Sequence, residues 1–178
     1  MLFRSPDAGG GPFPLVKDIE AAVRESFTGL LSRGEKVDWI TLAGNGEPTL
    51  HPHFRQITDL LIAMRDEFLP GVPVGILSNS STCHQVAVQD SLTRLDGCFM
   101  KLDAGTARTL KIINQPLVKL DWSQMISGLY HLRRFYLQSM FVAGKADNTG
   151  AEDIADWVQA VGYVRPVSVQ IYSTDRPT

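Results

Sequence analysis

TLAGNGEPTLHPHF (residues 41–54) joins a short apolar run to the start of a helix-like run. The run from Val37 to Ala43 is short, mostly apolar and rich in β-branched residues, as buried parallel strands are. Apolar residues at helical spacing then extend from Phe54 to Phe68. The stretch therefore predicts a strand, a polar turn and a helix. Glu47 lies between a glycine and a proline in that turn.

Strand-like and helix-like runs alternate along the rest of the chain. Further strands are predicted over Val74–Leu77, Cys98–Leu102, Leu137–Val142 and Val167–Tyr172. Helices are predicted over 16–31, 54–68, 85–95 and 106–113, and Gly34 ends the first of them. A fifth helix is predicted to start at an Asp121 cap and to carry an apolar stripe as far as Phe135. A sixth is predicted to start with a capping box over Thr149–Glu152. Strands recurring about every ~30 residues between helices predict a parallel α/β fold. The periodicity leaves open whether the sheet is open or curled into a barrel.

Composition excludes several broad classes of protein. The 178 residues fit one domain, and 44% hydrophobic against 20% charged residues is typical of a globular chain. The net charge is −2, which indicates no general grip on nucleic acid by charge alone, although a local basic patch remains open. No apolar run approaches the ~20 residues of a membrane span, and the first residues do not form a signal peptide. We therefore expect a cytoplasmic protein.

Polar residues follow every predicted strand. They are Gly44-Asn45-Gly46-Glu47, Ser78–Ser81, Lys101 with Asp103, Gly144–Asn148, and Ser173–Pro177, which includes Arg176. Ligands of parallel α/β proteins bind at the carboxyl ends of the strands. The pattern predicts one ligand site on this rim; the alternative is that these loops are polar only because loops are.

The turn after the first strand has two interpretations. Gly44 and Gly46 carry no Cβ, so a ligand can approach their backbone closely. Glu47 is then a fixed carboxylate suited to a ligand ammonium. The alternative is that Glu47 only complements the dipole at the start of the following helix.

The later rim residues also have alternative roles. Asp103 offers two acceptor oxygens for ribose hydroxyls, or caps the helix that follows it, or pairs with Lys101, which shares its face of the strand. Asn79 bonds a carboxylate or ribose, or simply ends its strand. His51 and His53 do not face one another in a helix start, so no metal pair is predicted. The sequence contains no Ser–His–Asp order, P-loop or dinucleotide fingerprint.

Four stretches together resemble the radical S-adenosylmethionine (radical SAM) superfamily, in its wyosine-synthase-like branch. They are GNGEPTLHP (44–52), SNSS (78–81), KLDAGTARTLKIINQP (101–116) and VQIYSTDRP (169–177). The resemblance runs over nearly the whole chain and implies a partial (β/α)6 TIM-like barrel of parallel strands. It implies that Glu47 and its glycines hold the methionine amino group of S-adenosylmethionine.

The same resemblance implies roles for the other rim residues. Asn79 and Asp103 would lie near the carboxylate or ribose of the cofactor, the 144–148 segment would flank the adenine, and Arg176 would face the substrate side. The full candidate cofactor-binding set is Gly44, Asn45, Gly46, Glu47, Ser78, Asn79, Lys101, Asp103, Asn148 and Arg176.

The chain departs from the family in one defining feature. The family's CxxxCxxC motif, which binds a [4Fe–4S] cluster, is absent, and so is the first strand that would carry it. Cys83 and Cys98 match no cluster or zinc spacing, and two thiolates cannot replace three, so we expect reduced, unpaired thiols. We expect residues 1–178 to be a radical SAM core domain that is incomplete at the N-terminus and at the C-terminus. The alternative is a genuine relative without a cluster.

The resemblance also implies a chemistry for the full-length parent. Reductive cleavage of S-adenosylmethionine at the cluster would give a 5′-deoxyadenosyl radical that abstracts a substrate hydrogen, with an external electron donor such as flavodoxin or ferredoxin. The substrate, whether tRNA, peptide or small molecule, stays open. Two alternatives remain: a non-catalytic barrel that binds S-adenosylmethionine or a nucleotide, and a phosphate- or sugar-binding barrel enzyme.

Overall fold

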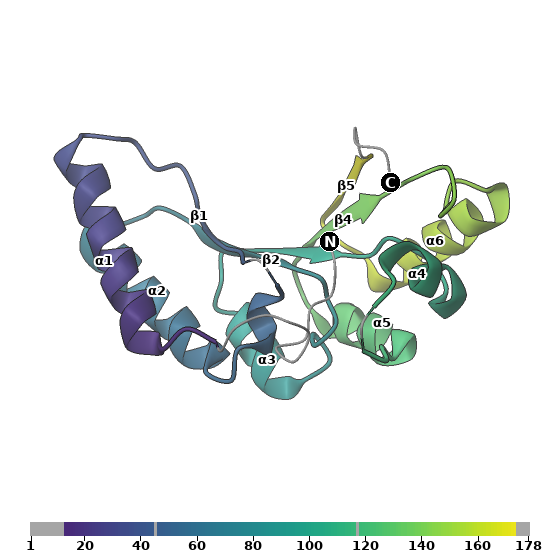
Figure 1. Ribbon diagram of the computed structural model, residues 1–178, viewed down its shortest axis with the longest axis horizontal. Coiled ribbons are helices and arrows are strands. Elements are labelled where there is room, and N and C mark those ends of the chain that lie inside the picture. Colours follow the sequence, from purple (N-terminus) through teal and green to yellow (C-terminus); the bar gives the residue numbers. More distant parts are fainter. Residues whose placement is uncertain (1–12, 45, 117, 174–178) are drawn as a thin grey trace.

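The computed structural model describes residues 13–44, 46–116 and 118–173, and its centre is a curved parallel sheet (Figure 1). The five strands lie in the order β1-β2-β3-β4-β5, and every neighbouring pair is parallel. Their bounds are β1 Ile40–Leu42, β2 Val74–Ser78, β3 Gly97–Lys101, β4 Tyr136–Met140 and β5 Ser168–Tyr172. The predicted parallel α/β fold is confirmed, and its curvature fits part of a barrel.

Helices connect the strands and lie along the convex face of the sheet (Figure 1). Their bounds are α1 Val16–Ser32, α2 Phe54–Phe68, α3 Val86–Leu92, α4 Ala107–Asn114, α5 Trp122–His131 and α6 Ala151–Val164, with a short 3-10 helix, η1, at Pro48–Leu50. Alternate strand residues such as Ile76, Met100 and Leu137 face these helices and are fully buried. Burial of this apolar surface is the main term that holds the helices on the sheet.

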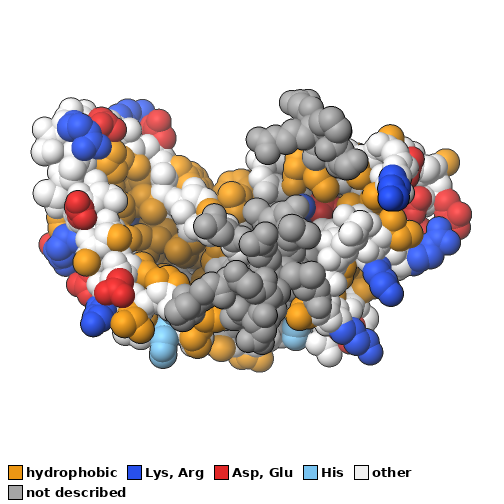
Figure 2. Space-filling view, viewed as in Figure 1, with side chains coloured by type: hydrophobic (Ala, Val, Ile, Leu, Met, Phe, Trp, Pro, Cys, Tyr) orange, Lys and Arg blue, Asp and Glu red, His pale blue; other side chains and the backbone are white. Residues whose placement is uncertain are grey.

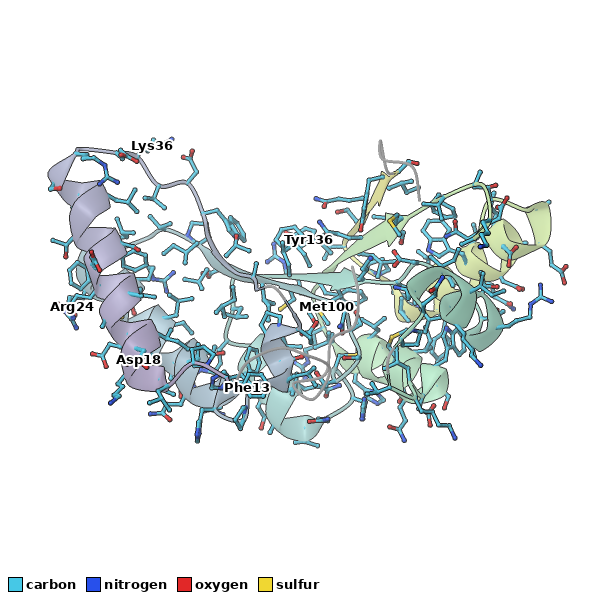
Figure 3. All side chains as sticks on the ribbon, viewed as in Figure 1. Phe13, Asp18, Arg24, Lys36, Met100 and Tyr136 are labelled. Atoms are coloured by element: carbon cyan, nitrogen blue, oxygen red, sulfur yellow. The ribbon has the colours of Figure 1, made fainter. Side chains whose placement is uncertain are left out.

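None of the described helices lies on the opposite face of the sheet, which is lined by aromatic rings near the start of the strands. Trp39 lies over Gly75 and Gly97, where an added Cβ would come within 2.9 Å of its ring. Phe99 contacts Trp39 edge-on and stacks on Tyr136, with ring centroids 5.9 and 5.1 Å apart. Figure 3 shows Tyr136 on this face and Met100 on the helical one. The absence of a Cβ at the two glycines therefore leaves space for the Trp39 ring on this face of the sheet.

β1 forms one edge of the sheet and borders an apolar hollow. Among the described residues β1 pairs only with β2, and α1 packs against α2. A cavity of about 310 Å³ lies between these elements, lined largely by apolar side chains that include Val23, Phe27, Ile40, Leu61 and Met64. Figure 2 shows hydrophobic side chains in this hollow between the α1–α2 end and the sheet. Within the described residues, the outer edge of β1 therefore has no pairing strand and borders this apolar cavity, as the edge of an unprotected strand does.

Two details of the predicted helices are wrong. α5 ends at His131, so Phe135 is not on its stripe but is buried in the turn before β4. No capping box opens α6, because its N-cap is Gly150 and the Thr149 hydroxyl donates to Asp147 Oδ1 at 2.8 Å. The Asp147 carboxylate also accepts from Thr149 N, a local turn that competes with capping. The Asp121 cap is confirmed by bonds from the backbone N–H groups of Ser123 and Gln124.

None of the helices in the described ranges is long and apolar enough to cross a membrane.

Candidate functional site

Glu47 is the first of the buried polar groups at the carboxyl ends of the strands. It is 6% exposed and caps η1, not α2. Its Oε1 accepts from Thr49 N at 3.1 Å, Thr49 Oγ1 at 2.6 Å and Ser78 Oγ at 2.9 Å. Its Oε2 accepts from Asn79 N at 2.5 Å. The carboxylate therefore ties the glycine turn after β1 to the end of β2, and Oε2 keeps a lone pair free of these bonds.

The turn after β2 continues this hydrogen-bond chain to β3. Ser80 has φ +69°, a left-handed conformation that turns the chain sharply. Its hydroxyl donates to the backbone oxygen of Lys101 at 2.9 Å. The Asn79 Oδ1 accepts from Ser81 N at 2.9 Å, so this side chain also ends its strand, as one of the two interpretations predicts.

Lys101 and Asp103 form a buried ion pair at the end of β3. Lys101 Nζ lies 3.0 Å from Asp103 Oδ2, and Asp103 is 1% exposed. Asp103 Oδ2 also accepts from Asn114 Nδ2, and Oδ1 accepts from Met140 N, both at 2.8 Å. Both carboxylate oxygens of Asp103 therefore have partners, and Oδ1, which accepts a single bond, keeps a lone pair free of these bonds, as Oε2 of Glu47 does. Asp103 does not cap α4, since Thr106 occupies that position.

Two residues near this ion pair present polar groups of their own. The Oδ1 of Asn114 is buried and has no hydrogen-bond partner among the described residues. An unpaired buried acceptor costs about 1–3 kcal/mol, so a ligand donor at this point would remove that cost. Burial raises the pKa of the Tyr172 phenol; the charge of Asp103 raises it further, while the Lys101 ammonium lowers it.

Asn148 joins the loop after β4 to the ends of β3 and β4. Its Nδ2 donates to the backbone oxygens of Asp103 and Met140 at 2.7 and 2.8 Å. Its Oδ1 accepts from Val142 N at 2.8 Å. The side chain is 1% exposed, so it fixes the shape of the loop that the resemblance places beside the adenine.

The described rim groups carry an excess of negative charge. Glu47 and Asp103 contribute −2 and Lys101 contributes +1, for a net −1, and no cation of the described residues pairs with Glu47. An uncompensated buried carboxylate favours a cationic ligand. Gly44 is exposed and Gly46 half-buried beside it, and the nearest atoms that a Cβ on Gly44 would meet are those of Gly46, at 3.8 Å.

The structure thus brings most of the predicted site residues into one network. Glu47, Ser78, Asn79, Lys101, Asp103 and Asn148 belong to it, and Gly44 and Gly46 adjoin it. Asn45 and Arg176 lie outside the described residues. The candidate set omitted Thr49, Ser80, Asn114 and Tyr172. Ser80 lies in the polar segment 78–81 predicted for the rim, and the only signal for the other three was their presence within the motifs that resemble the family.

Neither cysteine is placed to hold a metal. Burial raises the pKa of both Cys83 and Cys98 to about 12. Their thiols contact the backbone oxygens of Met125 and Leu92. Among the described residues no group of three or more His, Cys, Asp or Glu side chains could bind a metal ion. The residues present therefore do not fit a [4Fe–4S] cluster.

Comparison with known proteins finds relatives along most of the chain. It is 32% identical to a UPF0026 protein of Helicobacter pylori over 149 residues, which is 80% of this chain and 46% of that protein. It is 30% identical over 152 residues to a protein named GTPase Obg of Brachyspira hyodysenteriae, covering 83% of this chain and 22% of that protein. The chain thus spans about half, or less, of the relatives it matches. No family model matches it.

Solved structures with the same fold include several enzymes. One is TYW1 with a lysine-pyruvate adduct bound, with a TM-score of 0.60 and 16% identity, covering 98% of this chain and 57% of that one. Another is coproporphyrinogen III oxidase of Escherichia coli, described as a radical SAM enzyme, with a TM-score of 0.62, 12% identity, and coverage of 90% and 38%. A third is Streptococcus suis SuiB bound to S-adenosylmethionine, with a TM-score of 0.59, 14% identity, and coverage of 92% and 35%. At these identities the likeness is one of fold, and the chain shares the α/β architecture of these proteins.

Proposed function

We propose that this chain is a radical SAM-type barrel domain whose rim binds S-adenosylmethionine. The observation that carries the proposal is the buried hydrogen-bond chain that links the carboxyl ends of β1, β2, β3 and β4. Its net charge of −1 suits S-adenosylmethionine, whose ammonium, sulfonium and carboxylate sum to +1. The shared fold of SuiB, which binds this compound, supports the same ligand.

Each rim element then has a distinct role in the proposal. The bare backbone of Gly44 and Gly46, with the free lone pair on Glu47 Oε2, receives the ammonium. Glu47 holds that turn in place through its bonds to Thr49, Ser78 and Asn79. The orphaned Asn114 Oδ1 accepts from a ribose hydroxyl, beside the ion pair of Lys101 with Asp103. Asn45 and Arg176 stay in the candidate set as predictions.

The residues of this chain do not provide the three cysteine ligands of a [4Fe–4S] cluster. Radical chemistry in this family uses a [4Fe–4S] cluster on three cysteines, and the two thiols here are buried and far from the thiolate state. We therefore assign cofactor binding, and not cleavage of the cofactor, to the rim of this chain. A protein that supplies three further cysteines would be needed for reductive cleavage.

Calorimetric titration with S-adenosylmethionine tests the proposal. We expect saturable one-to-one binding, and an Asn114→Ala variant weakened by about 1–3 kcal/mol, the usual cost of an unpaired polar partner. Glu47→Ala and Asp103→Ala should weaken binding by a similar amount. Glu25→Gln, an exposed carboxylate on α1, is the control and should bind as the wild type does. Absence of measurable affinity in the folded wild type would exclude the site.

A second candidate follows from the same cysteine geometry: a module that binds S-adenosylmethionine or a nucleotide without radical chemistry. Adenosine and S-adenosylhomocysteine separate the two. S-adenosylhomocysteine lacks the sulfonium charge, so the net −1 rim should bind it more weakly. Equal affinity for adenosine and S-adenosylmethionine would favour a general nucleoside module.

A further inference from the structure

Two exposed tyrosines stack on one another at the end of the sheet opposite the rim. Tyr130 lies in the last turn of α5 and Tyr163 in the last turn of α6, and these helices pack side by side (Figure 1). Their ring centroids are 4.9 Å apart with an interplanar angle of 23°. The residues remain 47% and 53% exposed, so much of each ring is open to solvent.

Three arginines lie in the loops that follow these helices. Arg133 and Arg134 precede β4, Arg165 precedes β5, and all are exposed. The two loops are neighbours, since Val167 N donates to Phe135 O at 2.9 Å. None of the three arginines takes part in a salt bridge within the described part of the chain.

The sequence around these loops has no acidic residue. Residues 122–146 and 157–173 contain neither Asp nor Glu, although the whole chain carries 19 of them and a net charge of −2. The three arginines of the Tyr130–Tyr163 patch (Tyr130, Tyr163, Arg133, Arg134 and Arg165) therefore contribute +3, and no acidic residue adjoins them within these two stretches of the sequence. This is the local basic patch that the composition left open.

A purely structural role accounts for only part of this patch. A cation near a helix C-terminus complements the helix dipole, but the effect falls off within the last turn, and Arg133 and Arg134 lie beyond the Leu132 C-cap of α5. Arg165 has φ +54°, a left-handed conformation at the end of α6 that glycine or asparagine would adopt with less strain. Dipole complementation also gives no reason for an exposed, stacked tyrosine pair.

We propose that the Tyr130–Tyr163 patch binds a single-stranded polynucleotide. Arginines neutralise phosphates, and bases stack on exposed aromatic rings with little sequence preference. An acidic peptide or an anionic membrane would match the charge, but a polynucleotide carries a planar base on every charged repeat, which suits arginines beside stacked rings. This surface is separate from the rim, so polynucleotide binding here is independent of cofactor binding at the rim.

Fluorescence anisotropy with labelled 12-nucleotide oligo-U RNA and oligo-dT DNA tests the inference on the full chain. We expect saturable binding that weakens as KCl rises from about 50 to 200 mM. The triple variant Arg133→Gln, Arg134→Gln, Arg165→Gln should bind at least about tenfold more weakly. Its slope of log Kd against log salt should fall by about 2, since each single-strand phosphate contact contributes about 0.7. Arg108→Gln, an exposed arginine on α4, is the matched control and should bind as the wild type does.

The tyrosines provide the second arm of the test. Tyr130→Ala and Tyr163→Ala should each weaken binding by about fivefold or more, while Tyr163→Phe keeps the ring and the affinity. A preference for RNA or for DNA identifies the sugar, and either supports the inference. Circular dichroism of each variant establishes that it is folded. The inference is overturned if the wild type binds neither oligonucleotide, if loss of the rings has no effect, or if polyglutamate or phosphatidylserine vesicles displace the oligonucleotide equally well at the same charge concentration.

Discussion

Replacement of Glu47 by alanine should destabilise the protein strongly, because its carboxylate serves as an internal hydrogen-bond acceptor. Two of its four donors are hydroxyls, which can rotate toward other partners; Thr49 Oγ1 already contacts Thr82 Oγ1. The other two are the backbone N–H groups of Thr49 and Asn79, which cannot move independently of the chain. Each buried N–H left unpaired costs about 1–3 kcal/mol. We therefore expect Glu47→Ala to lower the free energy of unfolding by about 2–6 kcal/mol.

Glu47→Gln refines this expectation. The amide keeps the shape and one acceptor oxygen, but its NH₂ group then faces one of the two backbone donors. Only one N–H loses its partner, so the cost should be about 1–3 kcal/mol. Urea unfolding followed by circular dichroism measures both variants, compared through their midpoints at constant m-value.

The control is Glu25→Gln, which repeats the Glu47→Gln change at an exposed position of α1 and should stay within about 0.5 kcal/mol of the wild type. If Glu47→Ala is as stable as the wild type, or more stable, the carboxylate does not hold the turn. It would then be a strained group kept free for a ligand, and the positioning role assigned to it would be wrong.

Three further predictions concern the sheet and the thiols. Gly75→Ala should lower the free energy of unfolding by about 1–3 kcal/mol, since its Cβ would lie 2.6 Å from Gly97 O and 2.9 Å from the Trp39 ring; an unchanged thermal midpoint would contradict the close packing. Cys83 and Cys98 should resist a thiol reagent at pH 8 in the folded protein. Rapid labelling of the folded protein would refute this. Because folding raises the pKa of both thiols from 9.0 to about 12, the stability that the two buried thiols contribute should be complete below pH 9.0 and lost as the pH rises toward 12. The open β1 edge should promote dimers or aggregates in light scattering, and a monodisperse monomer would count against it.

The strands and most helices follow directly from the sequence because their signals are local. Alternation places Ile76, Met100 and Leu137 on the helical face, and Asp121 caps its helix with its own side chain. The errors have equally local causes. The Asp147 carboxylate accepts hydrogen bonds from both the backbone N–H and the hydroxyl of Thr149, so Thr149 does not cap α6. The spacing of apolar residues gives no sign of this competition.

The site could be predicted only in part, because its contacts are not local in sequence. Which rim residues belong together follows from parallel strands ending at one edge, but what each one bonds depends on contacts across the sheet. The hydrogen bond from Met140 N to the Asp103 carboxylate joins residues 37 apart in sequence, and the bond from Asn148 Nδ2 to the Asp103 backbone oxygen joins residues 45 apart. The sequence offered three roles for Asp103, as a ribose acceptor, a helix cap or a partner of Lys101. The structure shows the pairing with Lys101 and adds Asn114 and Met140 as partners that the sequence did not indicate.

Titration calorimetry with S-adenosylmethionine and S-adenosylhomocysteine on the same preparation tests the central claim most directly. The net −1 rim, with its unpaired Asn114 oxygen, predicts one site per chain that prefers the sulfonium compound and is weakened by Asn114→Ala. Heats no larger than those of dilution for both compounds, from a chain that unfolds cooperatively in urea, would contradict it.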